Sequence, residues 1–210
     1  MINSWNKVIY KIWSPFYDYF FNTGAFLKAR ESVFQNISFQ EGQKILFVGV
    51  GTGADIEMVL HHNLNITAID FSKDMLNKAK AKYHKKSIVF QEMDAQNLTF
   101  EDEDFDIIVA SLILSVVPNP ERCLQEMTRV VKPQGKIIIF NKFAPVNQRL
   151  SISKKIMKGV IKVLGTDISL VFEDIFQKNN QLLRIEEDTP IMMNGMYRKI
   201  VIRKIKNTAI

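Results

Sequence analysis

The chain has 210 residues, a length typical of one domain with its own hydrophobic core. The hydrophobic fraction of 47% and charged fraction of 24% are those of a globular protein and exclude wholesale disorder. The single cysteine, Cys123, excludes an internal disulfide and a cysteine-based zinc site. The longest uncharged apolar stretch, Ile107 to Pro118, is shorter than the roughly 20 residues of a membrane-spanning helix, and no apolar run near Trp5 resembles a signal peptide. We therefore expect a cytoplasmic protein.

The net charge of +6 is unevenly placed along the chain. Residues 1–141 hold 15 basic and 16 acidic side chains, whereas residues 142–210 hold 13 basic and 6 acidic ones. This excess in the last third predicts a positive surface there. The alternative is compositional, because a chain rich in Lys, Asn and Ile is also what an AT-rich genome encodes.

The first 41 residues predict an aromatic helical cap. Aromatic side chains recur at helical spacing from Trp5 to Gln35, and Pro15 and Gly24 divide this stretch into two helices.

Residues 42–141 alternate between strands and helices. The apolar run Ile45–Val48 predicts a buried strand, which leads into Gly49, Gly51 and Gly53 and a helix over 54–61. The next elements are a strand at 66–70, a helix with Ser72 as N-cap, strands at 88–90 and 105–111, a helix at 120–131, a turn at 133–135 and a strand at 136–141. Such alternation predicts a parallel sheet with helices on both faces.

The alternation stops after residue 141. We expect helical segments at 150–164 and 168–179, forming an insertion over 142–180. Two strands then close the chain at 182–187 and 197–205, with a long loop containing Pro190 and Gly195 between them.

Three features mark the carboxyl ends of successive predicted strands, where open α/β sheets bind their ligands. Glycines at 49, 51 and 53 allow close approach of a ligand and a turn with positive φ. Asp70 follows Gly53 by 17 residues, where a carboxylate can bind both hydroxyls of a ribose. Asp94 ends the third strand and could accept from an adenine amino group. Together they predict a site for an adenosine-containing cofactor.

These motifs resemble those of class I S-adenosylmethionine-dependent methyltransferases. ILFVGVGTG (45–53) is similar to the family's glycine motif, and AIDFSKDML (68–76) to its second motif. MDAQNLTFEDEDFDIIVAS (93–111) and ERCLQEMTRVVKPQGKIIIF (121–140) are similar to the motifs that follow. The resemblance implies a Rossmann-like, mostly parallel seven-stranded sheet whose antiparallel last strand lies between the fifth and sixth. It implies one methyltransferase domain, in which residues 181–210 form the terminal strand pair.

The resemblance also assigns roles at the cofactor site. Gly49, Gly51 and Gly53 would pass beneath the methionine part of S-adenosylmethionine, and Asp70 would hold the ribose with Phe71 against the adenine. Asp94 and the Ala95 backbone would contact the adenine edge, and Ser111 and Leu112 would border the methyl group. One departure concerns Phe47, which stands where the family usually has an acidic residue.

The acceptor is less defined by sequence. Tyr17 and Asn141 are the substrate-binding candidates, no catalytic base is named, and no metal-ligand set is visible. The three histidines are expected at the surface and Cys123 in helix packing. The helix at 150–164 has an apolar side opposite Lys154, Lys155, Lys158 and Lys162. It predicts contact with an anionic membrane, although such helices also commonly cover a core.

Several functions remain open. The basic helix, the aromatic N-terminus and the NKFAP segment together resemble bacterial phosphatidylethanolamine N-methyltransferases. Phe16-Tyr17-Asp18 resembles a tyrosine-containing N-terminal segment of methyltransferases that act on quinones and phospholipid amines. These resemblances imply a small or lipid-like acceptor. The alternatives are a soluble small-metabolite methyltransferase, an RNA methyltransferase and a non-enzymatic cofactor-binding protein. Against the RNA methyltransferase, Ser111–Leu114 lacks the signature of enzymes that methylate the amino groups of bases. A nicotinamide enzyme shares the glycine turn, and Ala54 at the last position of its GxGxxG fingerprint is compatible with either class. Asp94, the strand DIIVAS (106–111) and the turn at 131–135 favour the methyltransferase.

Overall fold

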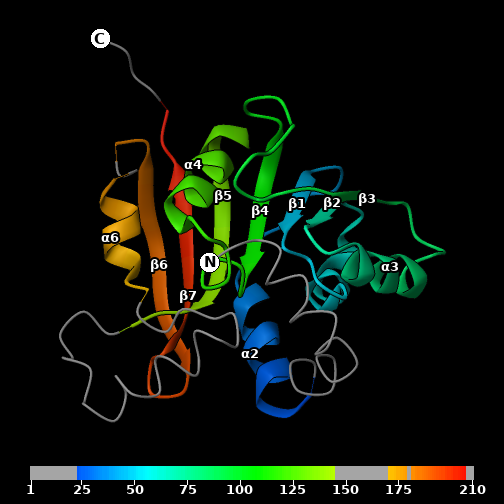
Figure 1. Cartoon of the computed structure of the whole chain (residues 1–210), viewed down its shortest axis with the longest axis horizontal. Helices are drawn as coiled ribbons and strands as arrows, with labels where there is room; N and C mark the ends of the chain where they lie inside the picture. Colours follow the sequence, from blue (N-terminus) through cyan, green and yellow to red (C-terminus); the bar gives the residue numbers. More distant parts are fainter. Residues whose placement is uncertain (1–22, 145–169, 179–180, 207–210) are drawn as a thin grey trace.

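The computed structural model describes residues 23–144, 170–178 and 181–206 (Figure 1). Tyr17, the first predicted N-terminal helix and the predicted basic helix at 150–164 lie outside these residues. The described helices are α2 (Gly24–Phe34), η1 (Ala54–His62), α3 (Lys73–Lys82), α4 (Pro120–Val130) and α6 (Phe172–Gln177). The strands are β1 (Lys44–Val48), β2 (Asn65–Asp70), β3 (Ile88–Glu92), β4 (Phe105–Ser111), β5 (Val131–Lys142), β6 (Leu183–Met192) and β7 (Tyr197–Lys204).

The seven strands form one sheet in the order β3-β2-β1-β4-β5-β7-β6. Strands β1 to β5 pair in parallel, whereas β7 runs antiparallel to both β5 and β6. The Rossmann-like architecture predicted from the motifs is therefore confirmed, including the insertion of β7 between β5 and β6. Because β1, β2 and β4 are central and parallel, their carboxyl ends meet at one edge of the sheet.

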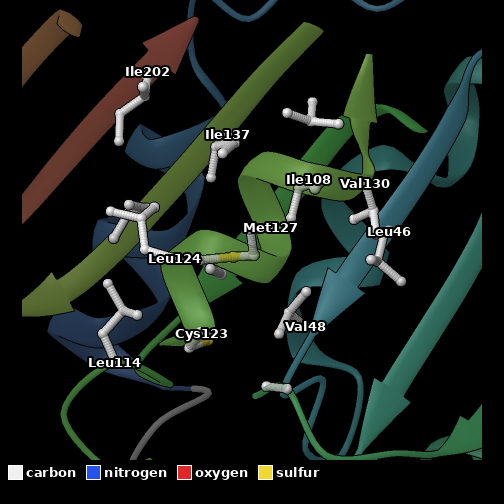
Figure 2. Packing of buried hydrophobic residues seen from close by; sticks show 14 of the residues in the cluster. Leu46, Val48, Ile108, Leu114, Cys123, Leu124, Met127, Val130, Ile137 and Ile202 are labelled. Atoms are coloured by element: carbon white, nitrogen blue, oxygen red, sulfur yellow. The ribbon is translucent and has the colours of Figure 1, made fainter. Parts of the chain in front are cut away.

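Two apolar clusters cover the two faces of the sheet. On one face, α4 and α6 pack on alternate residues of the central strands, and Figure 2 shows Cys123, Leu124, Met127 and Val130 of α4 directed at β1, β4 and β5. On the other face, α2, η1 and Tyr83 cover the intervening residues of the same strands. This double coverage explains why the central strands are almost continuously apolar.

Local sequence accounts for where the helices begin. Ser72 precedes α3, and its hydroxyl accepts from the Met75 amide at 3.4 Å. Asn119 precedes α4, where its Oδ1 accepts from the Arg122 amide at 2.9 Å and Pro120 fills the first helical position. These side chains satisfy amides that have no partner within the helix. The predicted N-cap at Ser72 is confirmed.

The helix predicted at 54–61 is confirmed as the 3₁₀ helix η1, Ala54–His62. One predicted helix is shorter than expected. The helix predicted at 168–179 is confined to Phe172–Gln177 among the described residues.

The two segments that contain proline were predicted only in part. The turn at 133–135 lies within the bounds of β5 but interrupts its pairing, because Val131 and Lys136 pair with Phe105 and Ile107 of β4 and Gln134 between them has a φ of 67°. Pro190 lies within β6, so the connection to β7 is short. Proline is tolerated there because β6 is an edge strand and needs no donor on its outer side.

Candidate functional site

The glycine turn follows β1 at the carboxyl edge of the sheet. Gly49, Gly51 and Gly53 have φ values of 69°, 57° and 85°, a region that side chains with a Cβ rarely adopt. The predicted need for positive φ is thus confirmed at all three positions. The Val50 amide donates to the Ile69 carbonyl at 2.9 Å, which ties the turn to the end of β2.

The space around these glycines differs. A Cβ on Gly49 would lie 2.6 Å from Ile113 Cδ1, and one on Gly53 would lie 2.7 Å from Tyr83 Cε2. At these two positions the protein's own side chains require glycine. A Cβ on Gly51 would meet no described atom within 4 Å. Gly51 is therefore the position of the turn at which a ligand can approach the backbone.

Asp70 ends β2 directly beside this open position. Its Oδ2 accepts from the Gly51 amide and its Oδ1 from the Ser72 amide, each at 2.8 Å. A carboxylate has about four acceptor sites, so these bonds orient the group and leave capacity for ligand hydroxyls. Burial raises the pKa of Asp70 above its ordinary value, although the backbone hydrogen bonds act in the opposite direction. The next residue, Phe71, is half-buried at the same edge.

Asp94 lies just beyond β3, next to the end of β2. The Met93 amide donates to the Asp70 carbonyl at 3.1 Å, which brings the two aspartate segments together. Asp94 Oδ1 accepts from both the backbone amide and the Nε2 of Gln96 at 2.9 Å, and Gln96 Oε1 accepts from the Asn119 amide at 2.8 Å. Ala95 is buried beside it. The Asp94 carboxylate is thus fixed against the start of α4.

Tyr83 supports the site from outside the recognised motifs. It follows α3, and its hydroxyl donates to the Gly53 carbonyl at 2.7 Å. This contact spans 30 residues of sequence, and no local pattern identifies it. Gln96 was missed for the same reason, because its role depends on where α4 begins.

Phe47 stands where the family usually has an acidic residue, so an apolar side chain packs at this position instead of a polar one. Phe47 is 1% exposed and belongs to the cluster on the α2 face. On this face a buried ion pair joins α2 to η1, with Arg30 Nη1 2.5 Å from Asp55 Oδ1.

Two buried polar atoms lie at the carboxyl ends of β4 and β5 without a hydrogen-bond partner in the described part of the chain. They are Ser111 Oγ and Asn141 Oδ1. Asn141 lies inside β5, which extends one residue beyond the predicted strand, and it is 0% exposed. Its register partner is Arg198, which lies over the Phe143 ring on the α4 and α6 face. Buried polar atoms are normally satisfied, so both are suited to hydrogen bonds from a ligand.

The remaining candidate groups lie away from this edge or within the core. Cys123 is fully buried, and its burial, followed by the nearby Asp94 and Glu126 carboxylates, raises the pKa of the thiol to about 12. His61 and His84 are exposed, and His62 is half-buried against Phe39. None of the described helices is both long and apolar enough to cross a membrane.

Comparison with known proteins agrees with this geometry. Residues 46–139 match the family described as the methyltransferase domain. Phosphatidylethanolamine N-methyltransferase of Cereibacter sphaeroides is 34% identical over 160 residues, which cover 74% of this chain and 77% of that protein. Demethylmenaquinone methyltransferase of Renibacterium salmoninarum is 36% identical over 110 residues, covering 52% of this chain and 46% of that protein. The chain therefore matches under half the length of this second relative.

A solved structure extends the likeness to the fold. The YcgJ protein from Bacillus subtilis superposes with a TM-score of 0.70 at 14% identity, covering 86% of this chain and all of that one. Fold, motifs and relatives together define a Rossmann-like methyltransferase. The chain belongs to the class I S-adenosylmethionine-dependent methyltransferase family, an enzyme family whose methyl donor is S-adenosylmethionine.

Proposed function

We propose that this chain transfers a methyl group from S-adenosylmethionine, bound across the carboxyl ends of β1 to β4, to a small or lipid-like acceptor. The acceptor class that we favour is a phospholipid amine at a membrane surface. The observation that carries the proposal is the contact of Asp70 with the Gly51 amide, beside the open position of the glycine turn. This arrangement joins an acceptor for ribose hydroxyls to backbone that a ligand can reach.

The proposed cofactor site uses Gly49, Gly51, Gly53, Asp70, Phe71, Asp94, Ala95 and Ser111. Asp70 would accept from the ribose hydroxyls, and Asp94 with the Ala95 backbone would bind the adenine. Bound there, the cofactor supplies a methyl group already activated on a sulfonium. The protein's own contribution is to align the acceptor in line with that group and to exclude water. An acceptor ammonium must lose its proton before it reacts, but we assign no general base.

The acceptor class is supported by two independent features. One relative is named for phosphatidylethanolamine and another for demethylmenaquinone, both amphiphilic acceptors. The predicted helix at 150–164 has a basic side and an apolar side, as expected of a segment that lies on an anionic membrane. We place the enzyme in the cytoplasm with peripheral contact to the membrane. Tyr17 and Asn141 remain proposed acceptor-binding residues, and we do not favour nucleic acid as a partner.

A methyl-transfer assay with labelled S-adenosylmethionine tests this function. The acceptors are phosphatidylethanolamine in vesicles that contain phosphatidylglycerol, the same lipid in phosphatidylcholine vesicles, a small-molecule extract and total RNA. We expect label in the phosphatidylethanolamine product, with faster transfer in the anionic vesicles. Label in the small-molecule fraction alone would instead establish a soluble-metabolite enzyme, and label in RNA would overturn the acceptor class altogether.

Calorimetric titration with S-adenosylhomocysteine tests the cofactor site without an acceptor. We expect binding by the wild type and none measurable by Gly51→Ala, whose added methyl group fills the open position. Absence of heat from folded wild-type protein would refute the cofactor assignment.

A further inference from the structure

Three polar side chains share one face of the sheet at its carboxyl edge. They are Ser111 at the end of β4, Lys142 at the end of β5 and Tyr197 at the start of β7. Lys142 and Tyr197 are direct register partners across the antiparallel pair, so their side chains point to the same face. Tyr197 and Phe140 belong to the apolar cluster on the α2 face, and residues two apart in a strand share a face. Lys142 therefore lies on the α2 face.

Ser111 reaches this face through the neighbouring strand. It pairs with Phe140 of β5, and Val109, two residues earlier in β4, belongs to the α2-face cluster. Adjacent strands lie about 4.8 Å apart and two residues of a strand span about 6.6 Å, so the Ser111 and Lys142 Cα atoms are separated by about 8 Å. Asn141 and Phe143 point to the opposite face.

These side chains have no polar partner among the described residues. The structure gives Lys142 Nζ, the Tyr197 hydroxyl and Ser111 Oγ neither a hydrogen bond nor an ion pair within the described ranges, and Ser111 Oγ is buried. Lys199, which lies two residues after Tyr197 in β7, shows the polar partners of a lysine that is buried for structural reasons. Lys199 Nζ lies 3.0 Å from the Gln35 carbonyl and 2.9 Å from Glu187 Oε2.

Burial without such compensation lowers the pKa of Lys142. For the Tyr197 phenol, burial raises the pKa and keeps the hydroxyl a donor at neutral pH. A half-buried ammonium beside a phenol donor is complementary to an anionic oxygen group.

The surroundings of these groups are apolar. The Tyr197 ring lies edge-on to Phe26 of α2, with 5.4 Å between ring centroids, and 5.9 Å from the ring of Phe140. The tip of the β6–β7 hairpin adds Ile191, Met192 and Met196 to the same cluster, and Met193 there is 56% exposed. The Phe143 amide donates to the Met196 carbonyl at 2.8 Å, which holds this hairpin tip against the end of β5. In Figure 1 the hairpin lies at the edge toward which β4 points.

We propose that Ser111, Lys142 and Tyr197 form a headgroup site for a phospholipid amine, in which Lys142 and Tyr197 bind the phosphodiester group. This inference rests on the proposed function and names how its acceptor is recognised. The ethanolamine nitrogen, two carbons from the phosphodiester oxygen, extends along the sheet edge toward Ser111 and the end of β4. The acyl chains lie against the methionine-rich hairpin tip.

Binding of dihexanoyl phosphatidylethanolamine, used below its micellar concentration, tests this site directly. Calorimetry on the whole chain in the presence of S-adenosylhomocysteine should show at least a tenfold loss of affinity in Lys142→Met and a smaller loss in Tyr197→Phe. The matched control is Lys85→Met, which removes the same charge at an exposed position beyond α3. The control should bind like the wild type, and all variants should bind S-adenosylhomocysteine equally.

Equal binding of the lipid by wild type and Lys142→Met would overturn the proposal. It would also be overturned if inorganic phosphate alone bound as tightly as the lipid, because the site would then recognise free phosphate. Methyl transfer is measured separately. Lysine-dependent lipid binding without transfer would refute the proposed function but support this site, whereas transfer that is unchanged by Lys142→Met would refute the site and leave the function intact.

Discussion

The Tyr83 hydroxyl donates to the Gly53 carbonyl at 2.7 Å, so the end of α3 holds the glycine turn that follows β1. The same ring occupies the space that a Cβ on Gly53 would need, at 2.7 Å from Cε2. One side chain therefore both supports the turn and requires its last residue to be glycine.

Substitution of Gly53 by alanine should combine backbone strain with a steric conflict. We expect a loss of about 2–4 kcal/mol in the free energy of unfolding, measured by urea denaturation. Gly42→Ala is the matched control, because Gly42 has a similar φ of 78° but nothing within 4 Å of the added Cβ. The control should lose only about 1 kcal/mol. Equal losses in the two variants would show that contact with Tyr83 plays no part.

Asp70 should control cofactor affinity and its dependence on pH. Asp70→Asn retains the shape of the side chain but removes a charged acceptor worth about 1.5–3 kcal/mol, a loss of roughly 10- to 100-fold in affinity. Since burial raises the pKa of Asp70, the carboxyl becomes protonated at higher pH than an exposed aspartate. Affinity of the wild type should therefore fall as the pH is lowered toward this raised pKa and be constant well above it.

Titration of S-adenosylhomocysteine at a series of pH values checks this expectation. Asp70→Asn should show a flatter profile than the wild type, and Asp74→Asn, an exposed neighbour on α3, should keep the wild-type profile. A wild-type affinity independent of pH over the acidic range would contradict the assigned role.

The Cys123 thiol should be inert in the folded protein. It is 0% exposed, and its pKa is raised to about 12, so almost no thiolate forms at pH 8. In the folded protein, labelling with iodoacetamide should proceed only at the rate of global unfolding. Once the protein is unfolded in urea, labelling should be rapid. Rapid modification of the native protein, followed by mass spectrometry, would be inconsistent with this packing.

The buried pair of Arg30 and Asp55 should be essential to the attachment of α2. Arg30→Met leaves the Asp55 carboxylate buried without this partner, and we expect a loss of about 3–5 kcal/mol in stability. Lys178→Met breaks an exposed pair with Glu121 of similar length, 2.6 Å, and should cost less than about 1 kcal/mol. Denaturant unfolding of both variants measures the difference. Similar losses would argue against a special role for the buried pair.

Sequence patterns predicted the elements whose signals are local. The apolar strand before Gly49, the cap at Ser72 and the strand at 105–111 were all identified in this way. Errors arose where tertiary pairing overrides a local signal. Pro190 indicates a loop in isolation, but an edge strand tolerates it.

The site was only partly predictable for the same reason. Asp70 follows an apolar strand at a recognisable distance from the glycines, so the sequence marks it. Tyr83 and Lys142 acquire their places through contacts that arise only on folding, namely the packing of α3 on the turn and the antiparallel register of β5 with β7. The face to which Asn141 points likewise follows from the register of β5 with β7, in which Asn141 pairs with Arg198.

The position of β7 between β5 and β6 has a consequence for folding during synthesis. Strands β1 to β5 can assemble as soon as they leave the ribosome, but β5 keeps an open edge until residues 197–204 emerge. Lys199 on that late strand also binds the Gln35 carbonyl at the end of α2, so the earliest described helix gains this contact only when the latest strand arrives. The nascent chain therefore keeps this strand edge exposed while residues 143–204 are synthesised.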